Sequence, residues 1–286
     1  MSIRKLVLLF VIIAAIGVGA ATAHAGSYRT WVSGTGNDTG SCTRTAPCLT
    51  FAYAIGQTNS GGEINCLDPG GFSPVTITIS VTIECEGVSY GAIQVSSGNA
   101  ITINTAGVVV NLIGLDIEGE DSTTPGPGVN ITAPAVVNIR NCKVYGFSSN
   151  TGIYFSPSAS GGILVLDNVL VANNGFGIYQ DVTSGAANMT VRNSTISNNS
   201  YGIYMHVAGG THAGATIEQT TLAFNSEFAL SVGSSAVALI GGSTVVNNST
   251  GVAAFGGTIY SFKNNQIGGN NIDGTPLTAY PGGPLN

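Results

Sequence analysis

The sequence contains few charged side chains, and very few of these are basic. Only 8% of its residues are charged, against about 25% in ordinary domains. It has eight Lys and Arg but fourteen Asp and Glu, which gives a formal net charge of −6. Proteins that bind nucleic acids depend on basic side chains that neutralise phosphates. The shortage of such residues therefore argues against nucleic acid as a partner.

The sequence also lacks the 3.6-residue hydrophobic period of a helical repeat. In its place, a short phrase returns at intervals of 22 to 27 residues. A period of this length, built from short runs with alternating apolar positions, is the signature of a β-solenoid. The copies are GLDIEGE (114–120), NCKVYGF (141–147), NVLVANN (168–174), NSTISNN (193–199), QTTLAFN (219–225), GSTVVNN (242–248) and NNQIGGN (264–270).

Two positions of this phrase keep their residue type from copy to copy. Stacked coils lie ~4.8 Å apart, so an inward apolar column would form a continuous core, and an Asn column at a turn would form a ladder of amide hydrogen bonds. We therefore predict an all-β parallel β-helix of about nine or ten coils. The apolar column is Ile117, Val144, Val171, Ile196, Leu222, Val245 and Ile267, and the Asn column is Asn174, Asn199, Asn225, Asn248 and Asn270.

The first 25 residues predict a cleaved export signal. Arg4 and Lys5 precede a long apolar stretch, which ends in the small-x-small cleavage site AHA (23–25). An uncleaved anchor is the alternative, but the stretch is short for a membrane span. We expect an exported chain with no further membrane segment, located in the periplasm, at the cell surface or outside the cell. The predicted parts are the signal peptide 1–25, a strand and capping helix at 26–60, the β-helix at 61–275 and an irregular tail at 276–286.

Five cysteines in an exported chain favour disulfides. Cys42 and Cys48 bracket a Pro-containing loop, and we predict that they close it. Cys66 and Cys85 end two similar β-type runs about one short coil apart, so that stacking would bring them together. Cys142 is left over as a candidate free thiol. A zinc site is the rival interpretation, which the absence of any Cys-x2-Cys spacing disfavours.

Residues 28–85 resemble the opening of exported bacterial β-helix proteins of the pectate-lyase-like superfamily. The resemblance rests on YRTWVSGTGNDTG (28–40), PCLTFAYAI (47–55) and GGEINCLDPGGF (61–72). It implies a right-handed coil and a short helix that lids the open end, which would otherwise expose core and strand edges. The superfamily includes lyases, hydrolases, epimerases and adhesins, so the resemblance predicts the fold and not the activity. The expected helix runs from Pro47 to about Thr58 and has Leu49, Phe51, Ala52 and Ile55 on one side.

The motifs of the best-known enzymes with this fold are missing. The sequence contains no Asp-Asp and no His-Gly, and it matches neither the calcium-binding nonapeptide nor the acidic cluster and Arg of pectate lyases. The densest acidic patch places Asp116 and Glu118 on the outer face of one strand, about 6–7 Å apart, which would suit calcium or glycoside hydrolysis. The alternative is a solvated face where Lys143, one coil further, pairs with Asp116. We therefore expect no cofactor, with calcium at this pair as the one candidate.

Three Gly-Ile-Tyr triplets, at 152–154, 177–179 and 202–204, should point their Ile inward and their Tyr outward. The outer tyrosines, which would stack, are Tyr154, Tyr179 and Tyr204. Two positions further, the same face carries Ser156, Asp181 and His206. Asp181 falls between the other two, which separates them by roughly 9–10 Å and rules out a simple Ser-His-Asp triad. Asp181 and His206 remain a candidate acid/base pair, and the alternative is a stack that only stiffens the coil.

We predict an exported β-helix protein that presents a glycan-binding or surface-interaction face to a polysaccharide or a cell-surface glycan. Tyrosine rings suit the C–H face and hydroxyl rim of a sugar, so Tyr154, Tyr179 and Tyr204 are the candidate binding residues. The alternative is a divergent polysaccharide lyase or glycoside hydrolase with Asp181 and His206 as its candidate catalytic residues. The missing motifs and the low charge favour the first interpretation, although the sequence does not decide whether the protein is an enzyme.

Overall fold

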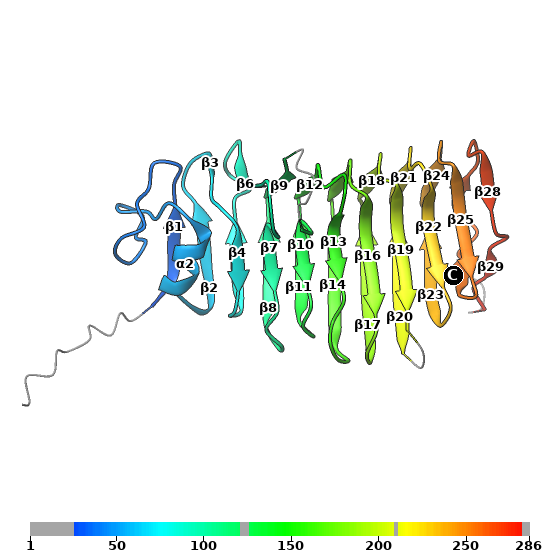
Figure 1. Ribbon diagram of the computed structural model, residues 1–286, viewed down its shortest axis with the longest axis horizontal. Coiled ribbons are helices and arrows are strands. Elements are labelled where there is room, and N and C mark those ends of the chain that lie inside the picture. Colours follow the sequence, from blue (N-terminus) through cyan, green and yellow to red (C-terminus); the bar gives the residue numbers. More distant parts are fainter. Residues whose placement is uncertain (1–25, 121–125, 209–210, 282–286) are drawn as a thin grey trace, which may run out of the picture.

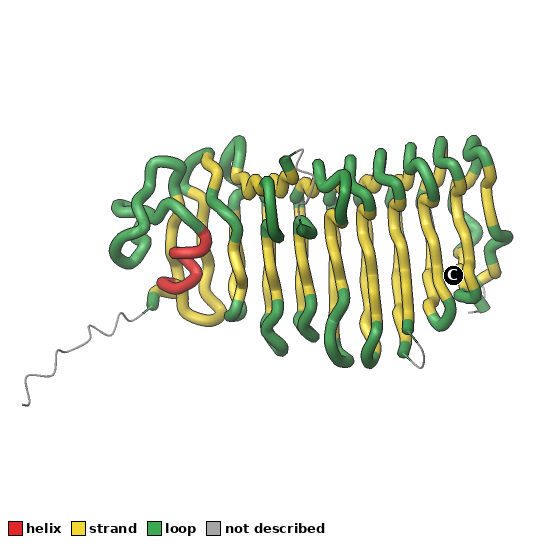
Figure 2. Tube along the Cα trace, in the orientation of Figure 1, coloured by secondary structure: helices red, strands yellow, loops and turns green. Residues whose placement is uncertain are grey.

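The computed structural model describes residues 26–120, 126–208 and 211–281. Over these residues the chain forms a long coil of parallel strands with one short helix near its N-terminal end (Figures 1 and 2). The predicted export signal, 1–25, lies outside the described residues. No helix within the described ranges has the length and the apolar character that a membrane span requires.

Three parallel sheets run along the coil, and successive strands of a sheet come from successive coils (Figure 1). Sheet 1 consists of β1 (Ser27–Val32), β2 (Thr58–Cys66), β5 (Val81–Glu84), β8 (Val109–Ile113), β11 (Val136–Arg140), β14 (Gly162–Asp167), β17 (Ala186–Arg192), β20 (His212–Glu218), β23 (Ala236–Gly241), β26 (Thr258–Ser261) and β29 (Thr278–Ala279). Sheet 2 consists of β3 (Gly70–Gly71), β6 (Gly91–Val95), β9 (Asp116–Gly119), β12 (Lys143–Tyr145), β15 (Leu170–Ala172), β18 (Thr195–Ser197), β21 (Thr221–Ala223), β24 (Thr244–Val246) and β27 (Gln266–Ile267). Sheet 3 consists of β4 (Val75–Ile77), β7 (Ile101–Ile103), β10 (Val129–Ile131), β13 (Thr151–Phe155), β16 (Phe176–Val182), β19 (Tyr201–Val207), β22 (Phe228–Gly233), β25 (Thr250–Phe255) and β28 (Ile272–Gly274). The predicted parallel β-helix is confirmed.

The coil continues further toward the C-terminus than the sequence indicated. We predicted an irregular tail over 276–286, but Thr278 and Ala279 form β29 and pair with Tyr260 and Ser261 of β26. The edge of β26 offers unpaired backbone groups, and the chain returns to satisfy them. Residues 278–279 of the predicted tail thus belong to the coil, and residues 282–286 lie outside the described residues.

The apolar column forms a single line through the core beneath sheet 2. Val144 pairs with Ile117 on one side and with Val171 on the other. The line then continues through Ile196, Leu222, Val245 and Ile267. All of these side chains except the last are completely buried, and burying each one contributes about 1.5–3 kcal/mol. Because one coil alone would leave its column residue exposed above and below, this stabilisation depends on stacking.

The asparagine column forms the predicted ladder at the turn between sheets 2 and 3. Each side-chain Nδ2 donates to the Oδ1 of the next asparagine, over distances of 2.9 to 3.2 Å. The same Oδ1 atoms also accept the backbone N–H of the previous ladder residue. The turn is completed by a left-handed residue directly before the ladder position, such as Asn173 (φ 57°) or Asn198 (φ 56°). The ladder residues are Asn174, Asn199, Asn225, Asn248 and Asn270.

The substitution Asn225→Ala tests this ladder. It removes the oxygen that accepts both the backbone N–H and the Nδ2 of Asn199. A buried donor left without a partner costs about 1–3 kcal/mol, so we expect the free energy of unfolding in a denaturant titration to fall by that amount. Asn188→Ala, on the exposed face of β17, is the control and should change it by less than about 0.5 kcal/mol. Equal stability of the two variants would contradict the ladder.

The helix α2 (Phe51–Gln57) begins later than the predicted start at residue 47. Thr50 occupies its N-cap and accepts a backbone N–H of the first turn with its side chain. The residues before it are held in an extended conformation, because the N–H of Cys48 donates to the carbonyl of Trp31 at 2.9 Å. This backbone bond and the neighbouring disulfide keep the preceding residues out of the helix.

The later start also changes which side of the helix is buried. Phe51 and Ala54 are completely buried, whereas Ala52 is exposed and Leu49 lies outside the helix with 38% exposure. The ring of Phe51 packs 5.0 Å from that of Phe72, between centroids. The helix therefore covers the N-terminal end of the core, as the resemblance implied, with a partly different set of residues.

Both predicted disulfides are present. Cys42 and Cys48 have Cα atoms 4.9 Å apart and close the loop before the helix. Cys66 and Cys85, with Cα atoms 4.8 Å apart, join the ends of β2 and β5 on successive coils. Disulfides of this kind typically contribute about 2–4 kcal/mol, and their presence is consistent with an extracellular protein.

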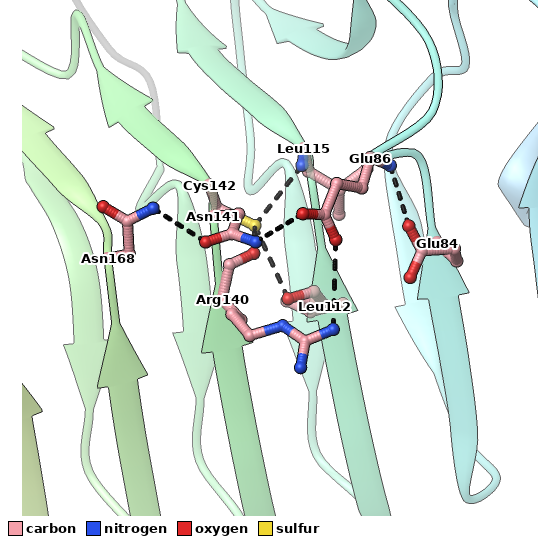
Figure 3. Close-up of polar contacts among 8 residues, drawn as sticks. All are labelled: Glu84, Glu86, Leu112, Leu115, Arg140, Asn141, Cys142 and Asn168. Carbon is pink, nitrogen blue, oxygen red and sulfur yellow. Dashed lines mark hydrogen bonds and ion pairs between the residues drawn. The ribbon is translucent and has the colours of Figure 1, made fainter.

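Cys142 is a free thiol buried in the turn between sheets 1 and 2 (Figure 3). Its Sγ accepts the N–H of Leu115 at 3.3 Å and donates to the carbonyl of Arg140 at 3.2 Å. Later coils place a hydroxyl in the same role: Ser194 accepts the N–H of Val169 and donates to the carbonyl two residues before it. The thiol thus has a structural task, which the repeat alignment indicates. The hydroxyl residues at this position are Ser194, Thr220 and Ser243.

This role predicts different effects for two substitutions of Cys142. The serine of Cys142→Ser can make both hydrogen bonds, so this variant should change the free energy of unfolding by less than about 1 kcal/mol. Cys142→Ala leaves the Leu115 N–H unpaired and should lower the free energy of unfolding by about 1–3 kcal/mol. Denaturant titration of both variants checks this, and equal destabilisation would show that the hydrogen bonds are unimportant. Because burial raises the pKa of Cys142 to about 12, the native thiol should also resist alkylation at neutral pH.

Candidate functional site

The outer surface of sheet 3 carries the predicted tyrosine column. Tyr154, Tyr179 and Tyr204 occupy the same position on β13, β16 and β19, and the isoleucines before them are completely buried. Ring centroids lie 5.4 Å apart for Tyr154 and Tyr179 and 5.2 Å apart for Tyr179 and Tyr204, with neighbouring rings edge to face at 73° and 82°. All three side chains are half-buried. We call these residues, together with Asp181 and His206, the tyrosine face.

A second row of rings, which we did not predict, runs beside this column. Phe176 stacks on Tyr201 with centroids 4.6 Å apart and planes 12° apart, and Tyr201 stacks on Phe228 at 5.9 Å and 22°. The two rows touch, because Phe176 lies 5.1 Å from Tyr179. The signal was present in the repeat, since an aromatic residue precedes the buried Ile or Leu by two positions in three successive coils. We call Phe176, Tyr201 and Phe228 the second aromatic row.

Asp181 connects residues of three successive coils. Its Oδ2 accepts the hydroxyl of Tyr154 at 2.7 Å, and its Oδ1 lies 2.7 Å from Nδ1 of His206. The Asp181 side chain is only 15% exposed, whereas that of His206 is 48% exposed. A carboxylate can only accept hydrogen bonds, so the Nδ1 of His206 carries a proton, and in the neutral imidazole Nε2 is then an acceptor. The structure therefore brings the two candidate acid/base residues together at the edge of the ring column.

The hydroxyls of Tyr154 and Tyr179 stay protonated at neutral pH. Burial raises the pKa of Tyr179 to about 12, and the negative charge of Asp181 adds to the shift. Burial also raises the pKa of Tyr154; a hydrogen bond with Ser156 opposes this shift, and the bond to Asp181 reinforces it. These hydroxyls are consequently hydrogen-bond donors and not bases.

Several polar groups along the column have no partner among the described residues. The hydroxyls of Tyr179 and Tyr204 form no hydrogen bond with any described residue. The column is bounded by Asn130, next to Tyr154, and by Ser231, next to Tyr204. The buried Oδ1 of Asn130 and the buried Oγ of Ser231 also lack partners there. Folded proteins satisfy most buried polar atoms, so these two atoms are exceptions. The hydroxyls of the half-buried Tyr179 and Tyr204 lie at the surface and are available to hydroxyls from water or from a ligand.

The sequence matches a known family over most of this coil. Residues 73–211 and 182–281 both match the right-handed beta helix region, and together they span well over half of the chain. The protein belongs to the right-handed β-helix family. The predicted handedness of the coil is thereby confirmed.

This right-handed β-helix also resembles a solved structure, that of pectate lyase Pel9A. The two superpose with a TM-score of 0.60 over 85% of this chain and 72% of that chain, at 14% sequence identity. An identity this low shows a common fold and carries no residue roles across. No curated protein matches the sequence. The fold that the resemblance of residues 28–85 implied is confirmed.

The acidic patch lies on sheet 2, away from the tyrosine face. The Nζ of Lys143 is 2.9 Å from Oδ1 of Asp116, which is the ion pair that we gave as the structural alternative. Glu118 accepts the hydroxyl of Tyr90 at 3.3 Å. Within the described ranges, no three His, Cys, Asp or Glu side chains are grouped so that they could hold a metal ion. Asp116 is engaged by a cation of the chain itself.

Two concave grooves lie on other parts of the coil. One follows the outside of sheet 1 and is lined by Arg140, Asp167 and Arg192, of which Arg192 and Asp167 form an ion pair at 3.0 Å. The other lies at the turn between sheets 1 and 2, beside Asn141 and Asn168, whose side chains bond to each other at 2.8 Å (Figure 3). In both grooves these polar side chains bond to one another along the coil, whereas the tyrosine face leaves hydroxyls unpaired.

Proposed function

We propose that this right-handed β-helix binds a glycan through the tyrosine face. The observation that carries the proposal is the hydrogen-bonded trio of Tyr154, Asp181 and His206 beside half-buried rings. An aromatic ring offers an apolar surface to the C–H groups of a sugar, and a tyrosine hydroxyl adds a polar tip. The imidazole and the unpaired hydroxyls supply donors and acceptors for the hydroxyl groups of that sugar.

The dimensions of the face suit a polymer. Coils are spaced by ~4.8 Å, so the three tyrosines extend over ~10 Å, a length comparable to two sugar units. The second aromatic row widens this strip and continues it to Phe228, whose ring lies 5.5 Å from that of Phe255. Small-molecule sites are usually concave and enclosing, whereas these rings form rows along the outer surface of one sheet. A chain that lies along the strip fits better than a small ligand.

The expected location of the protein agrees with such a ligand. The segment 1–25 has the charge and cleavage pattern of an export signal, and the two disulfides are of the kind that persist in oxidising compartments. A protein exported in this way meets cell-surface and extracellular polysaccharides.

Glycan binding is tested with Tyr179→Ala on a glycan array and by calorimetry on the array hits. Loss of the central ring removes its three ring contacts, with Tyr154, Phe176 and Tyr204, and its hydroxyl. We therefore expect affinity to fall at least tenfold, which corresponds to about 1.4 kcal/mol. Tyr260→Ala is the matched control, because Tyr260 is also half-buried and paired with a ring, that of Tyr280, but lies on sheet 1. Its affinity should equal that of the parent. If the folded Tyr179→Ala protein binds glycans as tightly as the parent does, the proposal is wrong and the tyrosine column has only a structural role.

A divergent lyase or hydrolase is the second candidate, and the Asp181–His206 contact favours it. Asp181 holds Nδ1 of His206, so that the half-exposed imidazole presents Nε2 as a possible proton acceptor. If this pair transfers protons, Asp181→Asn and His206→Gln should abolish product formation while they leave glycan affinity within about threefold of the parent. Assays for reducing ends and for unsaturated products on each array hit check this. A parent protein that releases neither product is a binding module.

A further inference from the structure

We infer that the glycan bound by the tyrosine face is uncharged and carries no carboxylates. This inference rests on the proposed function and narrows its ligand to one chemical class. It starts from the distribution of basic side chains over the three sheets. A polysaccharide with a carboxylate on each sugar would need cations beside the binding strip to offset the repulsion from acidic groups of the protein.

The described residues place no such cation near the face. Sheet 3 and the loops on both of its sides contain no Lys and no Arg in the described ranges. The basic residues lie instead on sheets 1 and 2, after β26 or in the disulfide-closed N-terminal loop. They are Arg29, Arg44, Arg140, Lys143, Arg192 and Lys263.

The charges that the face does carry are negative. Asp181 lies within the tyrosine face, and the exposed Glu227 directly precedes Phe228 of the second aromatic row. His206 can offset Asp181 when it is protonated, but it already contacts that carboxylate. A ligand carboxylate on this strip would therefore face like charge at close range and find no free positive partner.

The groups that the face leaves unpaired suit neutral hydroxyls. The hydroxyls of Tyr179 and Tyr204 have no hydrogen-bond partner among the described residues. Each can donate to a sugar hydroxyl or to an ether oxygen and accept one hydrogen bond in return. Neutral hexoses supply both kinds of group at every residue. An anionic polymer would instead find cations over sheet 1, where Arg140 and Arg192 line a groove.

The inference is tested with polymers that share a backbone and differ in carboxylates. Hydroxyethyl cellulose is compared with carboxymethyl cellulose, and methyl-esterified polygalacturonate with the same polymer after de-esterification, each by affinity electrophoresis and calorimetry at low salt. We expect the neutral member of a bound pair to bind at least tenfold more tightly. The difference should shrink as salt screens the repulsion.

Two charge-reversal variants test whether the weaker binding of carboxylated polymers arises at the tyrosine face. Glu227→Lys places a cation beside the second aromatic row and should strengthen binding of the carboxylated member more than that of the neutral one. Glu218→Lys makes the same change at an exposed site of β20 on sheet 1 and should leave the ratio unchanged. The inference would be overturned if the carboxylated member bound as tightly as the neutral one or more tightly, and if Tyr179→Ala abolished that binding. The proposed function would then still hold. Failure to bind any of these polymers or any array glycan would overturn both.

Discussion

Every coil of this protein lies one strand spacing above the previous one, and each side chain therefore has the same position of the next coil as its neighbour. The effect is clearest at the asparagine ladder, where one Oδ1 accepts from both the side chain and the backbone of the coil before it. A buried amide has four hydrogen-bonding sites to satisfy, and an identical residue directly above and below satisfies most of them. The repeated sequence is thus the means by which the polar turn can be buried at all.

The same stacking explains why the chain is poor in charge. Like charges in one column would lie ~5 Å apart and repel. Charged side chains are therefore found where the sign alternates from coil to coil, or at turns where the side chain points into solvent. Arg192 pairs with Asp167 on the preceding coil, and Arg140 lies 3.9 Å from Glu86 (Figure 3). Exposed pairs of this kind contribute only about 0–1 kcal/mol, and they favour correct register more than stability. Sheet 3 has aromatic columns where the other sheets have charges.

The features that depend on the repeat period could be predicted from the sequence, whereas those that depend on local backbone geometry could not. The core line through Val144, the ladder and both disulfides follow from the repeat, because stacking converts a residue interval into a contact. The helix start did not follow, because one backbone bond from Cys48 delays it. The role of Cys142 was also missed, since it requires seeing that a thiol stands where later coils have Ser194. At the site, the column and the Asp181–His206 pairing follow from register, but ring orientation does not.

Ring orientation on such a surface is constrained by the strand spacing. A phenol ring is wider than the ~4.8 Å between coils, so rings at one position of adjacent coils cannot all lie flat on the sheet. The second aromatic row meets this constraint by standing its rings face to face, at 12° for Phe176 and Tyr201. The tyrosine column meets it by alternation, with Tyr179 at 73° and 82° to its neighbours. No two neighbouring rings of the column are therefore parallel. A ligand that lay along the column would therefore meet a ring of a different orientation at each coil, at intervals of ~4.8 Å.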